Sequence, residues 1–320
     1  MPFDLSAVEK YSVGDNLRSL FKYSSKFLSC SPKELKEKDI LALPLISPGK
    51  SCEHSNKFLD GYSIPFLLNG SNNYAKTRAK LPEFVKLPSF VEQTFSLNGQ
   101  FVVMPESQTV YELMRSGSGL SQLPLALNWW ITSYQSQFAL TRVFLEALVD
   151  FNSIHALRFF DSHLSMNAYT LFCLSYLSFI GFDDLSFSSV VNMLSDALLI
   201  RHYVPDLAVR FSDFQGFACF PSKNLVVARE ASVDGRQRGS YLKFVNTNSA
   251  LADFELFLFG DSHSFSALSP LFSQLFGYVH FYWGIPENFP EFIEQFSCTS
   301  DPRLLVECSE RFFLKNSQVE

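Results

Sequence analysis

The chain has 320 residues, of which 47% are hydrophobic and 18% are charged, and this balance excludes an intrinsically disordered protein. The net charge is −6 with no block rich in Lys and Arg, which argues against nucleic acid as a partner. Phenylalanine is frequent, at 35 residues, and we interpret it as filling a core in place of Leu and Ile. The six cysteines show no CxxC spacing, which predicts buried thiols in a reducing compartment instead of a disulfide framework.

The first part of the chain mixes short charged stretches with turns rich in Pro, Gly and Ser. We treat residues 1–55 as an N-terminal extension of unassigned role and residues 56–320 as one domain. No basic region followed by an apolar stretch opens the sequence, so no secretory signal is predicted. The most apolar segment, residues 168–182, is shorter than a bilayer span and is expected to be a buried helix.

A sharper pattern begins after residue 98. Gln100–Met104 is predicted to be a buried strand that stops at Pro105, and residues 126–132 a second apolar strand. Helical periodicity predicts helices over residues 137–151 and 166–180. The end of the chain alternates strand, helix, strand, helix and strand, over residues 254–259, 267–276, 278–283, 288–296 and 304–308. Short links between such elements predict parallel strands with right-handed crossovers, which is an α/β, three-layer, flavodoxin-like architecture.

Ser262 is the first candidate catalytic residue. It lies in the run Gly-Asp-Ser-His-Ser, directly after the predicted strand at residues 254–259 and before a helix. In a parallel sheet this turn lies at the carboxyl edge, where ligands bind, and backbone amides at the helix start point the same way. A serine there can act as a nucleophile, with its own amide contributing to an oxyanion site.

A serine nucleophile needs a base and an orienting carboxylate. Asp161 and His163 provide both within three residues, since the carboxylate of an Asp-x-His turn can reach the imidazole and leave the other ring nitrogen for the serine. A plain alternative is that Asp161 caps a helix and His163 is a surface histidine. His263 could line the site, but a histidine on a turn is commonly just solvated. No His, Cys or Glu set has metal-ligand spacing, and no glycine-rich nucleotide motif is present.

These residues, taken together, resemble the alginate O-acetyltransferase family of SGNH-hydrolase-like proteins. The Asp-x-His motif precedes the serine by about a hundred residues, as in that family, whereas ordinary SGNH hydrolases have the reverse order. Three further stretches are similar to family segments: residues 66–72 (FLLNGSN), 101–111 (FVVMPESQTVY) and 306–313 (VECSERFF). Ser107 stands where the family has lysine, and Leu164-Ser165 stand where it has Trp-Asn.

The resemblance implies a Ser262–His163–Asp161 triad that transfers an acyl group, expected to be acetyl, to a carbohydrate or polysaccharide through an acyl-enzyme. It implies no cofactor beyond an acetyl donor of unknown identity, and it allows a membrane-bound acyl-donor protein as a partner. Family members are usually periplasmic, but no signal or transmembrane segment is predicted here, so a cytoplasmic location stays open.

Four residues are weaker substrate-binding candidates. Asn69 and Asn72 could supply a second oxyanion donor or a sugar contact, and His263 could line the site. Arg311 could bind substrate or could form a surface ion pair with Glu310 or Glu307. Two alternative functions remain: a carbohydrate esterase or deacetylase with water as acceptor, and a non-catalytic carbohydrate-binding or assembly protein on the same scaffold.

Overall fold

The computed structural model describes residues 78, 81, 86–116, 120, 123–151, 163–182, 194, 198–203, 216–221, 230–231, 239–296 and 303–317. The proposed extension, residues 1–55, lies outside this part, as do Asn69, Asn72 and Asp161. Its helices are α6 (Ser89–Ser96), α7 (Ser107–Ser116), α8 (Leu125–Ser133), α9 (Ala139–Phe151), α10 (Met166–Phe179), η3 (Ser264–Leu268), α13 (Ser269–Leu275), η4 (Pro286–Asn288), α14 (Phe289–Phe296) and α15 (Glu310–Asn316). Its strands are β1 (Gln100–Met104), β2 (Leu198–Tyr203), β3 (Gly216–Pro221), β4 (Glu230–Ala231), β5 (Tyr241–Val245), β6 (Leu251–Gly260), β7 (Phe276–Trp283) and β8 (Arg303–Ser309).

A six-stranded sheet in the order β1-β8-β6-β7-β5-β4 forms the centre of the fold. The β1/β8, β8/β6 and β6/β7 pairs are parallel, and β5 and β4 extend the β7 edge by antiparallel pairing. Strands β2 and β3 form a separate antiparallel pair. The prediction of an α/β fold with a mainly parallel sheet is therefore confirmed, although the antiparallel edge was not foreseen.

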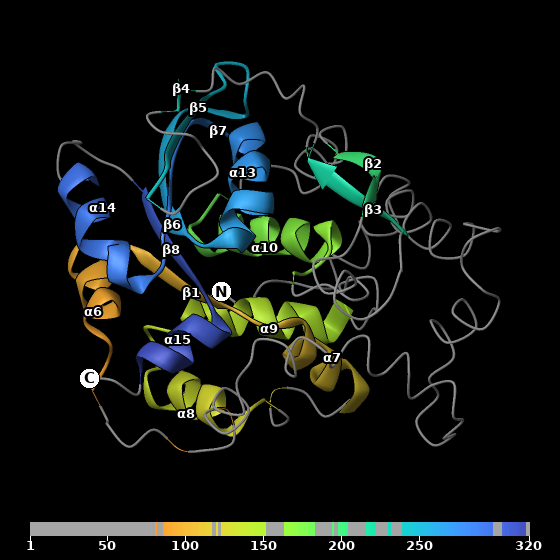
Figure 1. Ribbon diagram of the computed structural model, residues 1–320, viewed down its shortest axis with the longest axis vertical. Coiled ribbons are helices and arrows are strands. Elements are labelled where there is room, and N and C mark those ends of the chain that lie inside the picture. The colour runs from red at the N-terminus through yellow and green to blue at the C-terminus, as the bar shows by residue number, and fades with distance from the viewer. Residues whose placement is uncertain are drawn as a thin grey trace.

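Helices cover both faces of the sheet (Figure 1). Helices α6 and α14 lie on one face, and α9, α10 and α13 lie on the other. Phenylalanine fills much of the space between the layers: the buried ring of Phe101 on β1 packs against Phe90, Phe138 and Phe313 at centroid distances of 5.7, 5.6 and 5.8 Å. Among the described helices, none is both long enough and apolar enough to cross a bilayer.

One predicted strand was wrong. Residues 126–132 belong to helix α8, which follows Pro124. The buried side chains of α8 are Ala126, Leu127, Trp130 and Ile131, and their spacing marks one face of a helix. A short apolar run does not distinguish a strand from a buried helix by composition alone, and the packing of Trp130 against Phe138 and Phe313 decided the outcome here.

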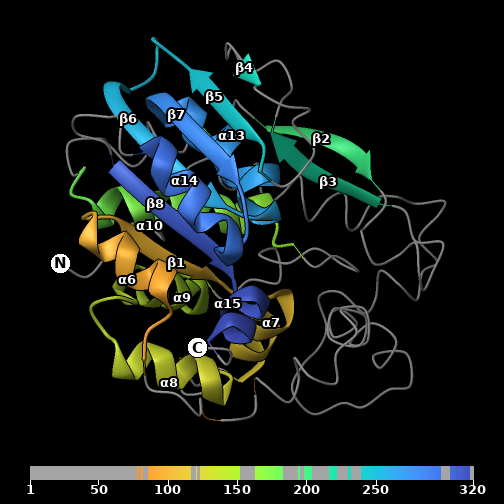
Figure 2. The ribbon, with the colours of Figure 1, turned by 60° about the vertical axis from the view of Figure 1, so that its left-hand side comes forward.

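The carboxyl ends of the four parallel strands meet at one end of the sheet. Strands β1 and β8 run towards α7 and α15 there (Figure 2). Strand β6 lies between β8 and β7, so the turn that follows Gly260 opens at the same end. Segments separated by about 50 to 200 residues along the chain are thus brought to one place.

Candidate active site

The turn after β6 begins the candidate site. The strand ends at Gly260, and Asp261, Ser262 and His263 lead directly into the helical turn η3. Asp261 and His263 are buried, whereas Ser262 is only partly buried. Within the described part of the chain, no acceptor takes the amide hydrogen of Ser262. The serine therefore combines a partly accessible side chain with an open backbone donor, which an oxyanion site requires.

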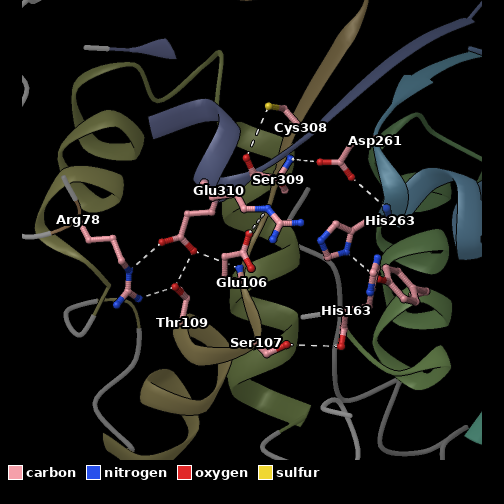
Figure 3. Close-up of polar contacts among 12 residues, drawn as sticks. Arg78, Glu106, Ser107, Thr109, His163, Asp261, His263, Cys308, Ser309 and Glu310 are labelled. Carbon is pink, nitrogen blue, oxygen red and sulfur yellow. Dashed lines mark hydrogen bonds and ion pairs between the residues drawn. The ribbon is translucent and has the colours of Figure 1, made fainter. Parts of the chain in front are cut away.

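Asp261 braces this turn against the end of β8 (Figure 3). Its Oδ1 accepts a hydrogen bond of 2.9 Å from the His263 amide, and its Oδ2 accepts one of 3.1 Å from the Ser309 amide. Burial acts to raise the pKa of Asp261, but the His263 ring, the hydrogen bonds from His263 and Ser309 and the Arg311 guanidinium outweigh it and lower that pKa. Asp261 is therefore an ionised carboxylate that fixes backbone geometry.

Glu307 lies behind the same turn. Its Oε2 accepts hydrogen bonds from the Asp261 amide at 3.0 Å and from the Ser264 hydroxyl at 2.8 Å. Burial, and then the nearby Asp261 carboxylate, raise the pKa of Glu307 well above its usual range. Gly260 makes this approach possible, since a Cβ there would lie 2.2 Å from Ser264 Oγ and 2.6 Å from Glu307 Oε2.

His163 lies close to the turn although it comes from a segment about a hundred residues earlier. Its ring centroid is 5.0 Å from that of His263, with an interplanar angle of 51°. The Ser107 hydroxyl, at the start of α7, donates a 3.4 Å hydrogen bond to the His163 carbonyl. No hydrogen bond joins the Ser262 hydroxyl to His163 among the described residues, so the roles of Ser262, His163 and Asp161 stay predictions.

His263 is not the solvated turn residue that was expected. It is 0% exposed, and its Nδ1 lies 2.6 Å from the hydroxyl oxygen of Tyr169 in the first turns of α10. Tyr169 is also fully buried. A buried imidazole held by backbone, side-chain and ring contacts belongs to the framework of the site, and its solvated interpretation is wrong.

Arg311 pairs with Glu106, and not with Glu310 or Glu307 as the ion-pair alternative supposed. Its Nε lies 3.4 Å from Glu106 Oε1. Burial raises the pKa of Glu106 from 4.5 to about 7; Arg311 and His163 act to lower it, whereas Glu310 and Asp261 add to the rise. Glu106 therefore changes charge near neutral pH beside the histidine. A substrate-binding role for Arg311 stays a prediction.

A second set of buried polar contacts supports this edge from the side of α15. The Glu310 carboxylate is 0% exposed and accepts hydrogen bonds from Thr109 Oγ1 at 2.5 Å, Arg78 Nε at 3.1 Å and the Glu106 amide at 3.2 Å. Arg78 also donates to Thr109 and Glu112. Figure 3 shows Arg78, Glu310 and Glu106 in a row that runs from Arg78 towards Asp261.

Sequence reasoning missed the roles of Glu106, Tyr169 and Glu307. Two of them carried a signal: Glu106 lies two residues after the end of β1, and Glu307 interrupts the apolar middle of β8. A buried carboxyl in such a position indicates a polar cluster at the sheet edge. Tyr169 carried none, since an aromatic residue in an apolar helix is most often plain core. Within the described residues, no group of three or more His, Cys, Asp or Glu side chains is arranged to hold a metal ion.

Comparisons with known proteins gave matches at the level of structure alone. No model of a protein family and no curated protein matches the sequence. Among solved structures, the chain is similar to PatB1 of Bacillus cereus, with 9% identity and a TM-score of 0.41 over 72% of this chain and 88% of that chain. PatB1 with a sulfonyl adduct gives 12% identity and 0.42 over 78% and 92% of the two chains. A DHHW family protein from Eubacterium siraeum gives 12% identity and 0.43 over 75% and 92%.

Proposed function

We propose that the protein is a serine-dependent O-acyltransferase of the SGNH-hydrolase-like type, which transfers an acetyl group to a hydroxyl of a carbohydrate. One observation carries the proposal: a partly buried serine with an open amide follows the end of a parallel strand, and the His163 ring centroid lies 5.0 Å from that of the next residue, His263. A nucleophile, a base and an oxyanion donor are the parts that acyl transfer needs.

In the proposed reaction, Ser262 Oγ attacks the carbonyl carbon of the acetyl donor while His163 takes the hydroxyl proton. The Ser262 amide stabilises the oxyanion of the tetrahedral intermediate. His163 then returns the proton to the leaving group, and an acetyl-serine ester remains. A sugar hydroxyl, deprotonated by His163, then attacks the acetyl-serine ester. The acetyl group passes to the sugar, and His163 returns the proton to Ser262 Oγ. Asp161 would orient the His163 ring, while Asp261 and Glu307 hold the serine turn.

The test is to detect the acyl-enzyme directly. The protein is incubated with a chromogenic acetyl ester, and intact mass is measured for the wild type and for Ser262→Ala. We expect an acetyl adduct on the wild type and none on the variant, which should keep its fold because one small turn residue replaces another. An adduct that persists in Ser262→Ala would overturn the assignment.

Oligosaccharides added to the same reaction identify the acceptor. Acetylated sugar, measured by mass spectrometry, is the result expected for a transferase. Release of acetate at an unchanged rate, with no acetylated sugar, would instead identify a carbohydrate esterase with the same serine. A wild type that forms no adduct would favour the non-catalytic alternative.

A further inference from the structure

The hydrogen bond between Tyr169 and His263 joins the segment of His163 to the segment of Ser262. Tyr169 lies in the first turns of α10, and its hydroxyl is 2.6 Å from His263 Nδ1. His163 stands just before the same helix, which Ser165 caps by accepting a 3.5 Å hydrogen bond from the Ala168 amide. Across the contact, His263 is the immediate neighbour of Ser262.

We propose that Tyr169 and His263 are positioning residues, which hold the His163 imidazole beside the Ser262 turn. The inference rests on the proposed function for its catalytic consequence, but not for the contact itself. Neither residue needs to touch the substrate. Three features constrain His263: its backbone amide donates to Asp261 Oδ1, its ring Nδ1 lies within hydrogen-bond distance of the Tyr169 hydroxyl, and its side chain is buried.

The orientation of the His163 ring matters because its two nitrogens point in different directions and only one of them can face the serine. A general base must present one nitrogen to the serine within hydrogen-bond reach, and small misplacements of a base reduce the rate strongly. The buried His263 ring packs against the His163 ring, with centroids 5.0 Å apart and planes tilted by 51°, and the Ser107 hydroxyl donates a hydrogen bond to the His163 carbonyl. Among the described residues, Asp261 interacts electrostatically with His263, and Glu106, which is paired with Arg311, interacts with His163.

Tyr169→Phe tests whether the Tyr169–His263 hydrogen bond positions His163, because it removes the hydroxyl and keeps the ring. We expect kcat for a chromogenic acetyl ester to fall by about 10- to 100-fold while KM changes by less than about 2-fold, as misplacement of a base predicts. Tyr176→Phe is the matched control: Tyr176 is in the same helix and fully buried, and its hydroxyl has no hydrogen-bond partner among the described residues. It should leave kcat unchanged.

Two substitutions at His263 keep the test clear if one variant folds poorly. The amide oxygen of Asn can stand near the place of Nδ1 and bond to Tyr169, whereas Leu cannot. His263→Asn should therefore retain more activity than His263→Leu. Equal losses in both, together with wild-type kcat in Tyr169→Phe, would overturn the proposal.

A measurement without substrate separates this inference from the proposed function. The imidazole signals of His163 are followed by NMR through a pH titration in the wild type, Tyr169→Phe and Tyr176→Phe. A His163 titration that shifts in Tyr169→Phe but not in Tyr176→Phe supports the positioning role, even if the wild type proves to have no acyltransfer activity. An unchanged His163 titration in both variants overturns the positioning role and does not contradict the proposed function.

Discussion

Glu106, Asp261 and Glu307 are buried at one end of the sheet, and their surroundings move their pKa values in different directions. Hydrogen bonds and nearby positive charge outweigh burial at Asp261 and lower its pKa, whereas burial dominates at Glu307 and Glu106 and raises theirs. Such divergence within one cluster is typical of sites that combine structural carboxylates with proton-holding groups. The pKa of Glu106 rises to about 7, so its change of charge falls near neutral pH.

Glu106→Gln should flatten the dependence of stability on pH. Because burial raises the pKa of Glu106 from 4.5 to about 7, the folded protein holds a proton between these values that the unfolded chain has lost. Its contribution is fully present below pH 4.5 and is lost as pH rises to about 7, with a slope of at most about 1.4 kcal/mol per pH unit. The free energy of unfolding, measured with urea between pH 4 and 8, checks this.

The exposed Glu92 on α6 offers the control for that titration. Glu92→Gln should keep the wild-type slope. If Glu106→Gln also keeps it, then the protonation of Glu106 does not differ between the folded and unfolded states in this pH range.

At the scale of elements, the junction of β6 with η3 shows how a strand can end in a tight turn. The chain passes from extended to helical backbone within two residues. Glu307 on the neighbouring strand accepts hydrogen bonds from the Asp261 amide and the Ser264 hydroxyl at this junction. Gly260 has no side chain in the space where Glu307 and Ser264 meet. Close packing at this junction, and not backbone conformation, requires the glycine.

Gly260→Ala should destabilise the protein by about 1–3 kcal/mol, because the new Cβ would overlap Ser264 Oγ and Glu307 Oε2. It should also lower activity, because the serine turn must shift. Gly181→Ala is a useful comparison: nothing lies within 4 Å of its Cβ position, and only its positive φ of 81° opposes the change. Thermal unfolding and activity, measured for both variants, distinguish steric overlap at Gly260 from backbone strain at Gly181. Wild-type stability and full activity in Gly260→Ala would contradict the packing argument.

At the scale of the whole molecule, buried charges join parts of the chain that are far apart in sequence. Arg78 contacts Glu310 across 232 residues, and Glu310 in turn contacts the residues that follow β1. The carboxylate of Glu310 is fully buried, so its positive partner is needed more than an exposed ion pair would be. This contact joins Arg78 to the end of the sheet that carries the candidate site.

Arg78→Met should cost on the order of 3 kcal/mol in the free energy of unfolding, because it leaves a buried carboxylate without its cation. Arg142→Met is the control, since the Arg142–Glu146 pair is exposed and should contribute less than about 1 kcal/mol. The double variant Arg78→Met/Glu310→Gln should recover part of the loss. A cost for Arg78→Met no larger than that for Arg142→Met would show that the contact does not stabilise the fold.

Much of the fold followed from the sequence because its signals are local. Apolar runs bounded by turn residues predicted β1, β6, β7 and β8, and helical periodicity predicted α9, α10 and α14. The strand–turn–helix pattern also predicted that Ser262 lies at a carboxyl edge, which the sheet order bears out. Helix α8 was mistaken for a strand because a mostly apolar run of seven residues, 126–132, carries too little periodicity to separate a helix from a strand.

The composition of the site, in contrast, depends on contacts between distant segments. Nothing local to Tyr169 indicates that its hydroxyl meets His263, or that Arg311 pairs with Glu106 and not with its neighbour Glu310. Sequence determined which residue types stand at the strand ends, since local propensity and burial act over a few residues. Only the tertiary structure decided which of them share a hydrogen bond or a charge, because the order of strands in the sheet selects the neighbours and burial then sets their pKa values.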